Sequence, residues 1–206
     1  MITIIDYGMG NLGSVANMIK KVGGKSIITS NKDDIKNAKK ILLPGVGAFD
    51  SAVRNLKKLH LWDLIKEKVL VEKVPIMGIC LGMQLLTKGS EEGELDGFGF
   101  IDAYAKRFEF EKEDLKIPHM GWNVVNLQKK SKLFEGMEHQ ENRFYFVHSF
   151  AVECKENKDI LTTTHYGYDF VSSFEKENII GCQFHPEKSH KFGMKLFKNF
   201  VEKYRC

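Results

Sequence analysis

The stretch that decides the fold is residues 75–84, which read PIMGICLGMQ. An apolar run leads into a cysteine with a glycine two residues before it and another two residues after it. This G-x-C-x-G pattern predicts a strand, a sharp turn and a helix, with Cys80 held at the turn as a nucleophile. The glycines leave room around the turn, and the N-terminus of the helix favours a thiolate. The alternative is a cysteine buried in a core strand, but a position at the strand end favours the nucleophile.

Around this turn, the first half of the chain alternates β-rich runs with helical stretches. The expected strands are Ile2–Asp6, Ser26–Thr29, Ile41–Leu43 and Pro75–Ile79. The expected helices are Gly13–Val22, Phe49–Val71 and Leu81–Thr87. Repeated βα units with continuous apolar strands predict an α/β fold with a central, mostly parallel sheet flanked by helices.

The second half of the chain changes character. The expected strands, separated by charged, turn-like segments, are Asn123–Leu127, Phe144–Val147, Ala151–Glu153, Phe170–Phe174 and Ile179–Phe184. They predict an antiparallel edge on the same sheet. The end of the chain, Gly193–Tyr204, has the pattern of an amphipathic helix. Because we find neither an internal repeat nor a linker, residues 1–206 are expected to form one domain.

Composition narrows the class of protein. The chain has 206 residues, of which 43% are hydrophobic, and a net charge of +4. Ordinary usage of this kind excludes a disordered or collagen-like chain. The lysines are dispersed, which argues against a nucleic-acid footprint. No apolar run reaches the length of a membrane span, and the N-terminus lacks the features of a signal peptide. A cytoplasmic protein with four free thiols and no zinc-type Cys/His spacing is expected.

A thiolate nucleophile needs a proton-transfer partner, and His185 in the sequence His185-Pro186-Glu187 is the best candidate. Pro186 disfavours a helical conformation for His185 and makes the segment extended. In an extended segment residues i and i+2 point to one face, so Glu187 can orient the imidazole and complete a triad. His148, which lies among apolar neighbours, is expected to be a structural residue beside the site.

An oxyanion needs backbone N–H donors near the nucleophile. The amide of Leu81, directly after Cys80, is one candidate. The loop of residues 44–47, PGVG, follows the preceding strand at the same edge of the sheet, and Gly47 is the natural second donor.

The glycines of residues 8–13, GMGNLG, match a dinucleotide-binding pattern literally. The acidic residue that such a site needs should stand at the end of the second strand, where Ser30 and Asn31 are found instead. Hydride transfer with a nicotinamide cofactor also does not require a Cys-His-Glu set. We therefore interpret these glycines as shaping a tight turn at a surface where another molecule docks.

Residues 78–84 (GICLGMQ) and 183–187 (QFHPE) together resemble the class I, or triad, glutamine amidotransferases. Further segments are similar to the glutaminase subunits of imidazole glycerol phosphate synthase, namely residues 6–12 (DYGMGNL), 43–47 (LPGVG), 118–123 (PHMGWN), 145–149 (YFVHS) and 185–189 (HPEKS). The resemblance covers essentially the whole chain.

The resemblance implies hydrolysis of glutamine to glutamate and ammonia by Cys80, His185 and Glu187, with no cofactor and no metal. It implies further that four residues form the glutamine-binding site, namely Gln84, Glu92, Ser149 and Phe150.

The resemblance also implies a partner. The ammonia would pass to a (β/α)8-barrel cyclase subunit in a heterodimer of histidine biosynthesis, and Asn11, Trp122 and Lys188 would face that subunit. For Trp122 the alternative is an ordinary core aromatic residue.

One segment departs from the family pattern. The histidine-pathway subunits usually carry Gln after Lys188-Ser189, whereas this chain has His190-Lys191-Phe192-Gly193. That variant resembles paralogues that supply ammonia for amidation of a surface sugar. Two other interpretations stay open. The chain could be a regulatory module on the same fold with an unused triad, or it could be a cysteine hydrolase of another class.

Overall fold

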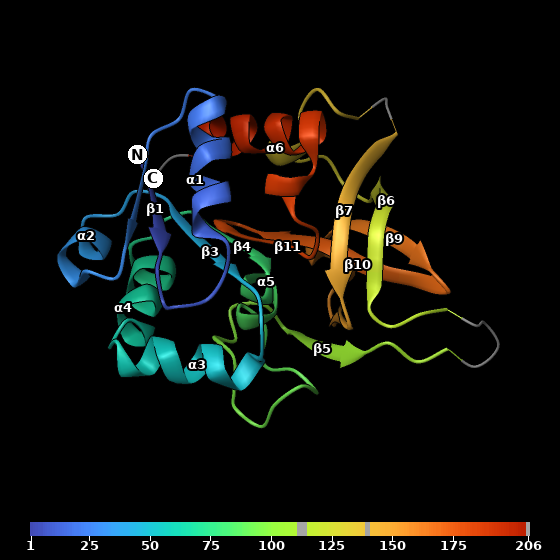
Figure 1. The fold of residues 1–206 in the computed structure, drawn as a ribbon, viewed down its shortest axis with the longest axis horizontal. Helices are drawn as coiled ribbons and strands as arrows, with labels where there is room; N and C mark the ends of the chain where they lie inside the picture. Colours follow the sequence, from blue (N-terminus) through green and yellow to red (C-terminus); the bar gives the residue numbers. More distant parts are fainter. Residues whose placement is uncertain (111–114, 139–140, 205–206) are drawn as a thin grey trace.

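The computed structural model describes residues 1–110, 115–138 and 141–204, and its strands form a mixed sheet with helices on both faces (Figure 1). The parallel strands, in spatial order, are β2 (Ser26–Thr29), β1 (Ile2–Ile5), β3 (Ile41–Gly45), β4 (Ile76–Cys80) and β11 (Ile179–Cys182). The carboxyl ends of these strands therefore meet at one edge of the sheet, as βα units require.

The remaining strands are antiparallel and extend the sheet beyond β11. In spatial order they are β10 (Tyr168–Lys176), β9 (Ile160–Tyr166), β6 (His119–Leu127) and β7 (Asn142–His148). A branch consists of β8 (Phe150–Cys154), which pairs with β10, and β5 (Ala103–Arg107), which pairs with β8. The expected fold, helices around a sheet with an antiparallel edge, is confirmed.

Helices cover both faces of the parallel strands. One face carries α1 (Leu12–Lys21) and α6 (His190–Lys203). The other carries α2 (Lys32–Lys36), α3 (Phe49–Lys58), α4 (Trp62–Lys66), the π-helix Glu67–Val71 and α5 (Leu81–Leu85). Short 3-10 turns span Lys132–Phe134, Asn157–Asp159 and Pro186–Lys188, the last of which is η4. No helix within the described ranges combines the length and the apolar character that a membrane crossing requires.

Alternating strand residues divide the core into two layers. Ile4 and Leu42 are fully buried in the layer with α1 and α6, whereas Ile5 and Leu43 are fully buried in the layer with α3, α4 and α5. Successive strand side chains point to opposite faces, so strands that are apolar throughout serve both layers. Because both faces of each parallel strand are packed, the strands are held in register, and the turns that follow them lie together at the carboxyl edge of the sheet.

The helix expected over Phe49–Val71 is wrong as one element, because the chain turns at His60. The φ angle of His60 is +56°. The amide of Leu61 donates to the carbonyl of Leu56 and that of His60 donates to Lys57, which is the Schellman arrangement that ends a helix. Histidine instead of glycine at the left-handed position hid this stop from the sequence.

Other boundaries also differ. The last helix begins at His190 and not at Gly193, and β6 begins at His119, ahead of the expected Asn123. Helix α2 and strands β5 and β9 were not among the expected elements. His139 and Cys206 lie outside the described residues.

Candidate active site

Cys80 lies at a strained turn between β4 and α5. It has φ +54° and ψ −111°, in the left-handed region that side chains rarely adopt. A residue in such a region costs about 1–3 kcal/mol, and the surrounding structure must hold it there. The strand delivers the side chain to the carboxyl edge of the sheet, and the helix that starts at Leu81 points its N-terminus at the same place.

The flanking glycines are required by contacts of the backbone. A Cβ atom at Gly82 would lie 1.7 Å from the carbonyl oxygen of Leu43, and one at Gly78 would lie 2.5 Å from the carbonyl oxygen of Gly82. Both contacts are with backbone, which cannot move aside as a flexible side chain could. The turn therefore packs directly on the end of β3, and the glycines allow that approach.

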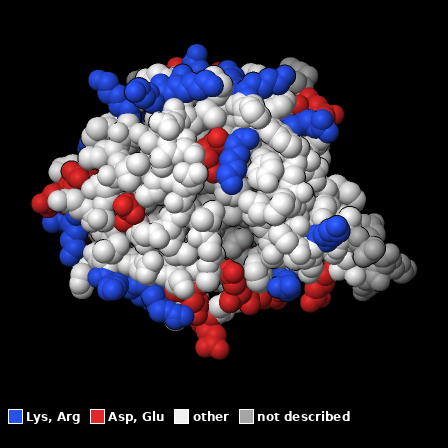
Figure 2. All heavy atoms as spheres, in the orientation of Figure 1, with Lys and Arg blue, Asp and Glu red and all other residues white. Residues whose placement is uncertain are grey.

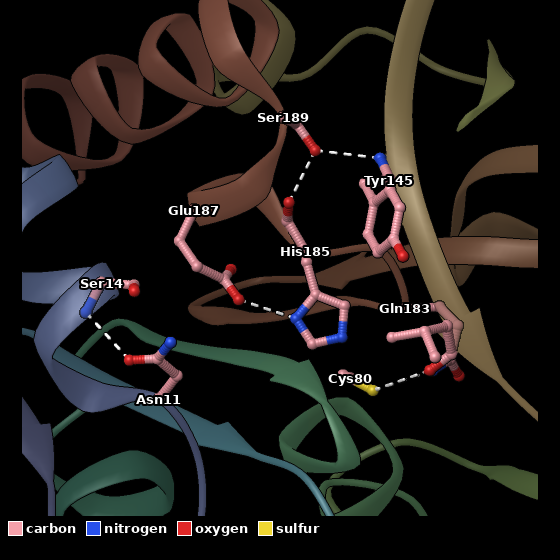
Figure 3. Close-up of polar contacts among 9 residues, drawn as sticks. Asn11, Ser14, Cys80, Tyr145, Gln183, His185, Glu187 and Ser189 are labelled. Atoms are coloured by element: carbon pink, nitrogen blue, oxygen red, sulfur yellow. Dashed lines mark hydrogen bonds and ion pairs between the residues drawn. The ribbon is translucent and has the colours of Figure 1, made fainter. Parts of the chain in front are cut away.

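His185 and Glu187 stand beside Cys80, as the sequence predicts. His185 follows β11, and its amide donates to the carbonyl of Tyr145 at 2.8 Å. Its Nδ1 lies 2.7 Å from Oε1 of Glu187, which belongs to η4. Only 2% and 4% of these two side chains are exposed. The imidazole lies between the carboxylate and the sulfur, with its Nε2 edge toward Cys80 (Figure 3).

The surroundings of His185 favour its protonated form. Burial opposes the charge on the imidazole, but Cys80 and Glu187 on either side outweigh it and raise the pKa of His185 to about 9. The Nε2 atom is buried and has no hydrogen-bond partner among the described residues, which leaves it available for proton transfer. A protonated imidazole beside the sulfur is the arrangement that activates a cysteine nucleophile.

Cys80 is distinct from the other described cysteines. Its Sγ lies 3.8 Å from the carbonyl oxygen of Val147 and 3.7 Å from Nε2 of Gln183. Burial raises the pKa of the Cys154 thiol to about 12, and that of the Cys182 thiol further still. Those two thiols are therefore poor nucleophiles at neutral pH.

The sulfur opens into a cavity of about 310 Å³. Its lining includes every residue proposed for the oxyanion hole and for glutamine, namely Gly47, Leu81, Gln84, Glu92, Ser149 and Phe150. His148 also lines the cavity, as does Pro118. A larger cavity of about 880 Å³ lies around residues 127–138, but among the described residues its lining contains neither a cysteine nor a histidine. The chemistry of the lining, not the size of the cavity, identifies the site.

Two of the polar side chains in the cavity are tethered. Nε2 of Gln84 lies 3.2 Å from Oε1 of Gln183 and 3.4 Å from the carbonyl oxygen of Phe150. Oε2 of Glu92 accepts a hydrogen bond from the amide of Phe49 at 3.0 Å, at the N-terminus of α3. These hydrogen bonds join Gln84 to the segment after β11 and to β8, and Glu92 to α3.

The glycine loop at the end of β1 packs against the PGVG loop. Gly10 has φ +104°, and a Cβ atom on it would lie 3.4 Å from Cα of Gly45. Gly47 has φ +111°, so its peptide can adopt orientations that other residues resist. Asn11, next to Gly10, is exposed, and its Oδ1 accepts a hydrogen bond from the amide of Ser14 as the cap of α1.

Trp122 and Lys188 lie outside the cavity, on the surface beside the triad. Trp122 is 45% exposed, so the alternative of a core aromatic is wrong. Its ring stacks on His190 with a centroid distance of 5.4 Å, and Nζ of Lys188 lies 5.6 Å from the ring centre of Tyr145.

Two residues with structural contacts to the triad were not predicted. Gln183 contacts the sulfur. Ser189 donates from its hydroxyl to the carbonyl of His185 at 2.6 Å and accepts from the amide of Tyr145 at 3.0 Å (Figure 3). Both lie within the segment of residues 183–189 that carries the family resemblance, but the sequence gives no sign of these contacts.

Comparison with known proteins assigns the family. The description "Glutamine amidotransferase class-I" matches residues 3–204. The chain is 55% identical over 202 residues to "Imidazole glycerol phosphate synthase subunit HisH 2" of Methanococcus maripaludis, covering 98% of this chain and 99% of that one. It is 50% identical to the protein of the same name from Pseudomonas aeruginosa, with the same coverage.

Solved structures share the fold at low sequence identity. A crystal structure of a glutamine amidotransferase superposes with a TM-score of 0.72 at 15% identity, covering 96% of this chain and 99% of that one. The structure of PurLQS from Thermotoga maritima gives a TM-score of 0.72 at 14% identity, covering 97% and 96%.

The raised pKa of His185 predicts that its imidazole keeps its proton in a pH range where an ordinary histidine has lost it. In the folded chain the ring should lose the proton near pH 9, because Cys80 and Glu187 favour the charged form, whereas in the chain unfolded in urea it should do so near the ordinary value of 6.5. NMR titration of the ring signals in the two states measures both values, and a folded-state titration near pH 6.5 would contradict the assignment.

Proposed function

Because the chain belongs to the class I glutamine amidotransferase family, we propose that it hydrolyses glutamine to glutamate and ammonia with Cys80, His185 and Glu187. The single observation that carries the proposal is the order Cys80, His185, Glu187, with Cys80 in the wall of the cavity and Nδ1 of His185 2.7 Å from Oε1 of Glu187. One glutaminase domain would take up residues 1–206.

The proposed reaction uses each triad member once per half-reaction. The Cys80 thiolate attacks the side-chain amide carbon of glutamine, and the C–N bond breaks as His185 gives its proton to the leaving ammonia. His185 then takes a proton from water, whose oxygen attacks the thioester carbon and releases glutamate from the sulfur. Glu187 holds the imidazole in the orientation that both steps need. A His185 pKa of about 9 supports a resting state with the proton already on the imidazole.

The negative oxygen of each tetrahedral intermediate would be bound by the amides of Leu81 and Gly47. Leu81 is the first residue of α5, where helix amides have no intrahelical acceptor. Gly47 supplies the second donor once its peptide turns toward the sulfur. A resting orientation that points away would give the isolated chain weak activity, and a partner that binds the turned state would raise it.

The cavity supports glutamine as the substrate. The carboxylate of Glu92 would pair with the α-ammonium group of glutamine, and Gln84 would contact a polar group of the bound amino acid. The backbone around Ser149 and Phe150 would meet the α-carboxylate. The small volume, about 310 Å³, supports a free amino acid over a protein substrate.

We infer further that the ammonia is used by a second subunit, because the relatives that this chain matches over 99% of their length are named as synthase subunits. The names of the relatives support a subunit of imidazole glycerol phosphate synthase in histidine biosynthesis. The partner would be a (β/α)8-barrel cyclase that forms a heterodimer with this chain in the cytoplasm. It would make imidazole glycerol phosphate and aminoimidazole carboxamide ribotide.

The docking face for that partner would include Trp122, Lys188 and Asn11. Exposure of Trp122 beside the triad supports this, since large aromatic residues are enriched at interfaces. In Figure 2 the charged side chains lie mainly along the upper and lower margins of the molecule, while the surface over β6 and β7 carries few charges. A surface of this kind suits a stable protein partner.

A second candidate function rests on His190. This residue stacks on Trp122, so the departure from the family pattern falls on the proposed docking face. A different barrel could be accepted there, and the ammonia would then amidate a surface sugar. The chemistry of the glutaminase would be the same.

Substitutions in the triad test the glutaminase. Cys80→Ala and His185→Ala should each lower the rate of glutamine hydrolysis by at least about 10⁴-fold, because the triad acts as a unit. Glu187→Gln should be about ten to a hundred times less damaging, since it orients but does not react. Release of glutamate by the complex with its barrel subunit is the readout, and Cys154→Ala is the control. Wild-type turnover by Cys80→Ala would rule the proposal out.

A complementation experiment separates the two pathways. We expect the gene to restore growth without histidine to a strain that lacks this glutaminase subunit, provided that the cognate barrel is co-expressed. If the pair fails to complement while it hydrolyses glutamine in vitro, the sugar-amidating function is favoured. Growth would make the His190 difference incidental to the pathway.

A further inference from the structure

Strand β6 presents two different faces. Met120 and Trp122 are 61% and 45% exposed, whereas His119 is only 3% exposed. Because successive strand residues point to opposite sides, Met120 and Trp122 belong to the proposed docking face, and His119 and Asn123 point to the interior. The interior pair belongs to the segment of residues 118–123, and the triad mechanism leaves both of them without a role.

A chain of hydrogen bonds leads from this interior face to the cavity. Nδ2 of Asn123 lies 3.2 Å from Nε2 of His119. Nδ1 of His119 lies 3.0 Å from Nε2 of His148, which stands directly opposite on β7. Nδ1 of His148 lies 2.8 Å from the carbonyl oxygen of Phe150. His148 and Phe150 both line the cavity that holds the sulfur.

The donor and the acceptor of each hydrogen bond in this series follow from the chemistry of the groups. A carbonyl oxygen only accepts, so His148 must carry its proton on Nδ1 and present Nε2 as an acceptor. His119 must then donate from Nδ1, and its Nε2 must accept from the amide of Asn123. The Oδ1 atom of Asn123 accepts from the amide of Val124 at 2.8 Å, which places the amide NH₂ group toward His119. Each histidine has only one tautomer that satisfies all its contacts.

The surroundings keep both rings neutral and in place. Burial lowers the pKa of His119 to about 4 and that of His148 to about 3. Tyr166 and Phe146 stack on the His119 ring with centroid distances of 4.1 and 4.8 Å. If either ring were protonated, two N–H donors would face each other in the series of hydrogen bonds. The hydrogen bonds therefore also require that both rings are neutral.

The series of hydrogen bonds ends at the carbonyl oxygen of Phe150, which also accepts a hydrogen bond from Nε2 of Gln84. Two buried side chains from different elements thus hold the carbonyl of a residue that lines the cavity, and with it the backbone from Ser149 to Ala151. We propose that His119 and His148 are positioning residues for the substrate: their directed hydrogen bonds set the orientation of the Ser149–Phe150 backbone that receives glutamine. This inference rests on the proposed function. It assigns the interior face of β6 to substrate binding and the exterior face to docking.

A pair of variants of equal shape tests the proposal. Asn and Leu both place an atom where Nδ1 of His119 lies, but only Asn can donate from it. His119→Leu should raise the KM for glutamine about tenfold with less than about a twofold change in kcat, because it leaves the buried Nε2 of His148 without a donor. His119→Asn should keep the KM within about threefold of the wild type. His165→Leu, at an exposed histidine, should change neither constant.

The assays use the complex of the full chain with its barrel subunit, and thermal unfolding shows that each variant is folded. Equal KM values for His119→Leu and His119→Asn would overturn the proposal. If even the wild type fails to hydrolyse glutamine, the proposed function has failed instead.

A measurement on the wild type does not depend on the folding of any variant. Long-range ¹H–¹⁵N spectra of the imidazole groups should show both His119 and His148 with the proton on Nδ1 and no change of either ring near neutral pH. A proton on Nε2 of either ring would break the directed chain and would also overturn the proposal.

Discussion

The backbone turn at Cys80 is the constraint on which the rest of the site depends. A non-glycine residue at φ +54° persists only when its neighbours hold it. Here the carbonyl of Leu43 lies where a Cβ atom of residue 82 would be, and Gly78 packs on the carbonyl of Gly82. The close approach of β3, β4 and α5 thus fixes the sulfur at the carboxyl edge of the sheet. That edge is where ligands bind in open α/β sheets.

Neighbouring strands of the sheet bring the base and part of the cavity wall to the sulfur. Strand β11 runs parallel to β4, so its carboxyl end brings His185 to the level of Cys80. Strand β7 then holds His185 from the other side through the carbonyl of Tyr145 and the hydroxyl of Ser189. One wall of the cavity is formed by residues 147–150, at the end of β7 and the start of β8. The parallel strands therefore position both the nucleophile and the base, and the antiparallel strands hold the base in place and complete the cavity wall.

The sequence predicts the parts of this site that depend on local chemistry. The glycines around Cys80 and the proline between His185 and Glu187 act on the residues next to them, so a single segment reveals each. The pairing of His119 with His148 depends on the register of β6 against β7, which periodicity alone does not determine. The helix stop at His60 was missed because histidine takes the place of the usual glycine. The tethers of Gln84 and Glu92 join segments far apart in sequence, so only the fold reveals them.

The most direct test of the proposed site is covalent labelling of the chain by an electrophilic glutamine analogue, followed by peptide mass mapping. We expect one adduct, on Cys80, and its suppression by excess glutamine, because the turn at Cys80 presents this thiol to a cavity that receives the amino acid. The buried Cys182 and the half-buried Cys154 should stay unmodified. An adduct on another cysteine, or labelling of Cys80 that excess glutamine does not slow, would contradict the assignment of Cys80 as the nucleophile of a glutamine site.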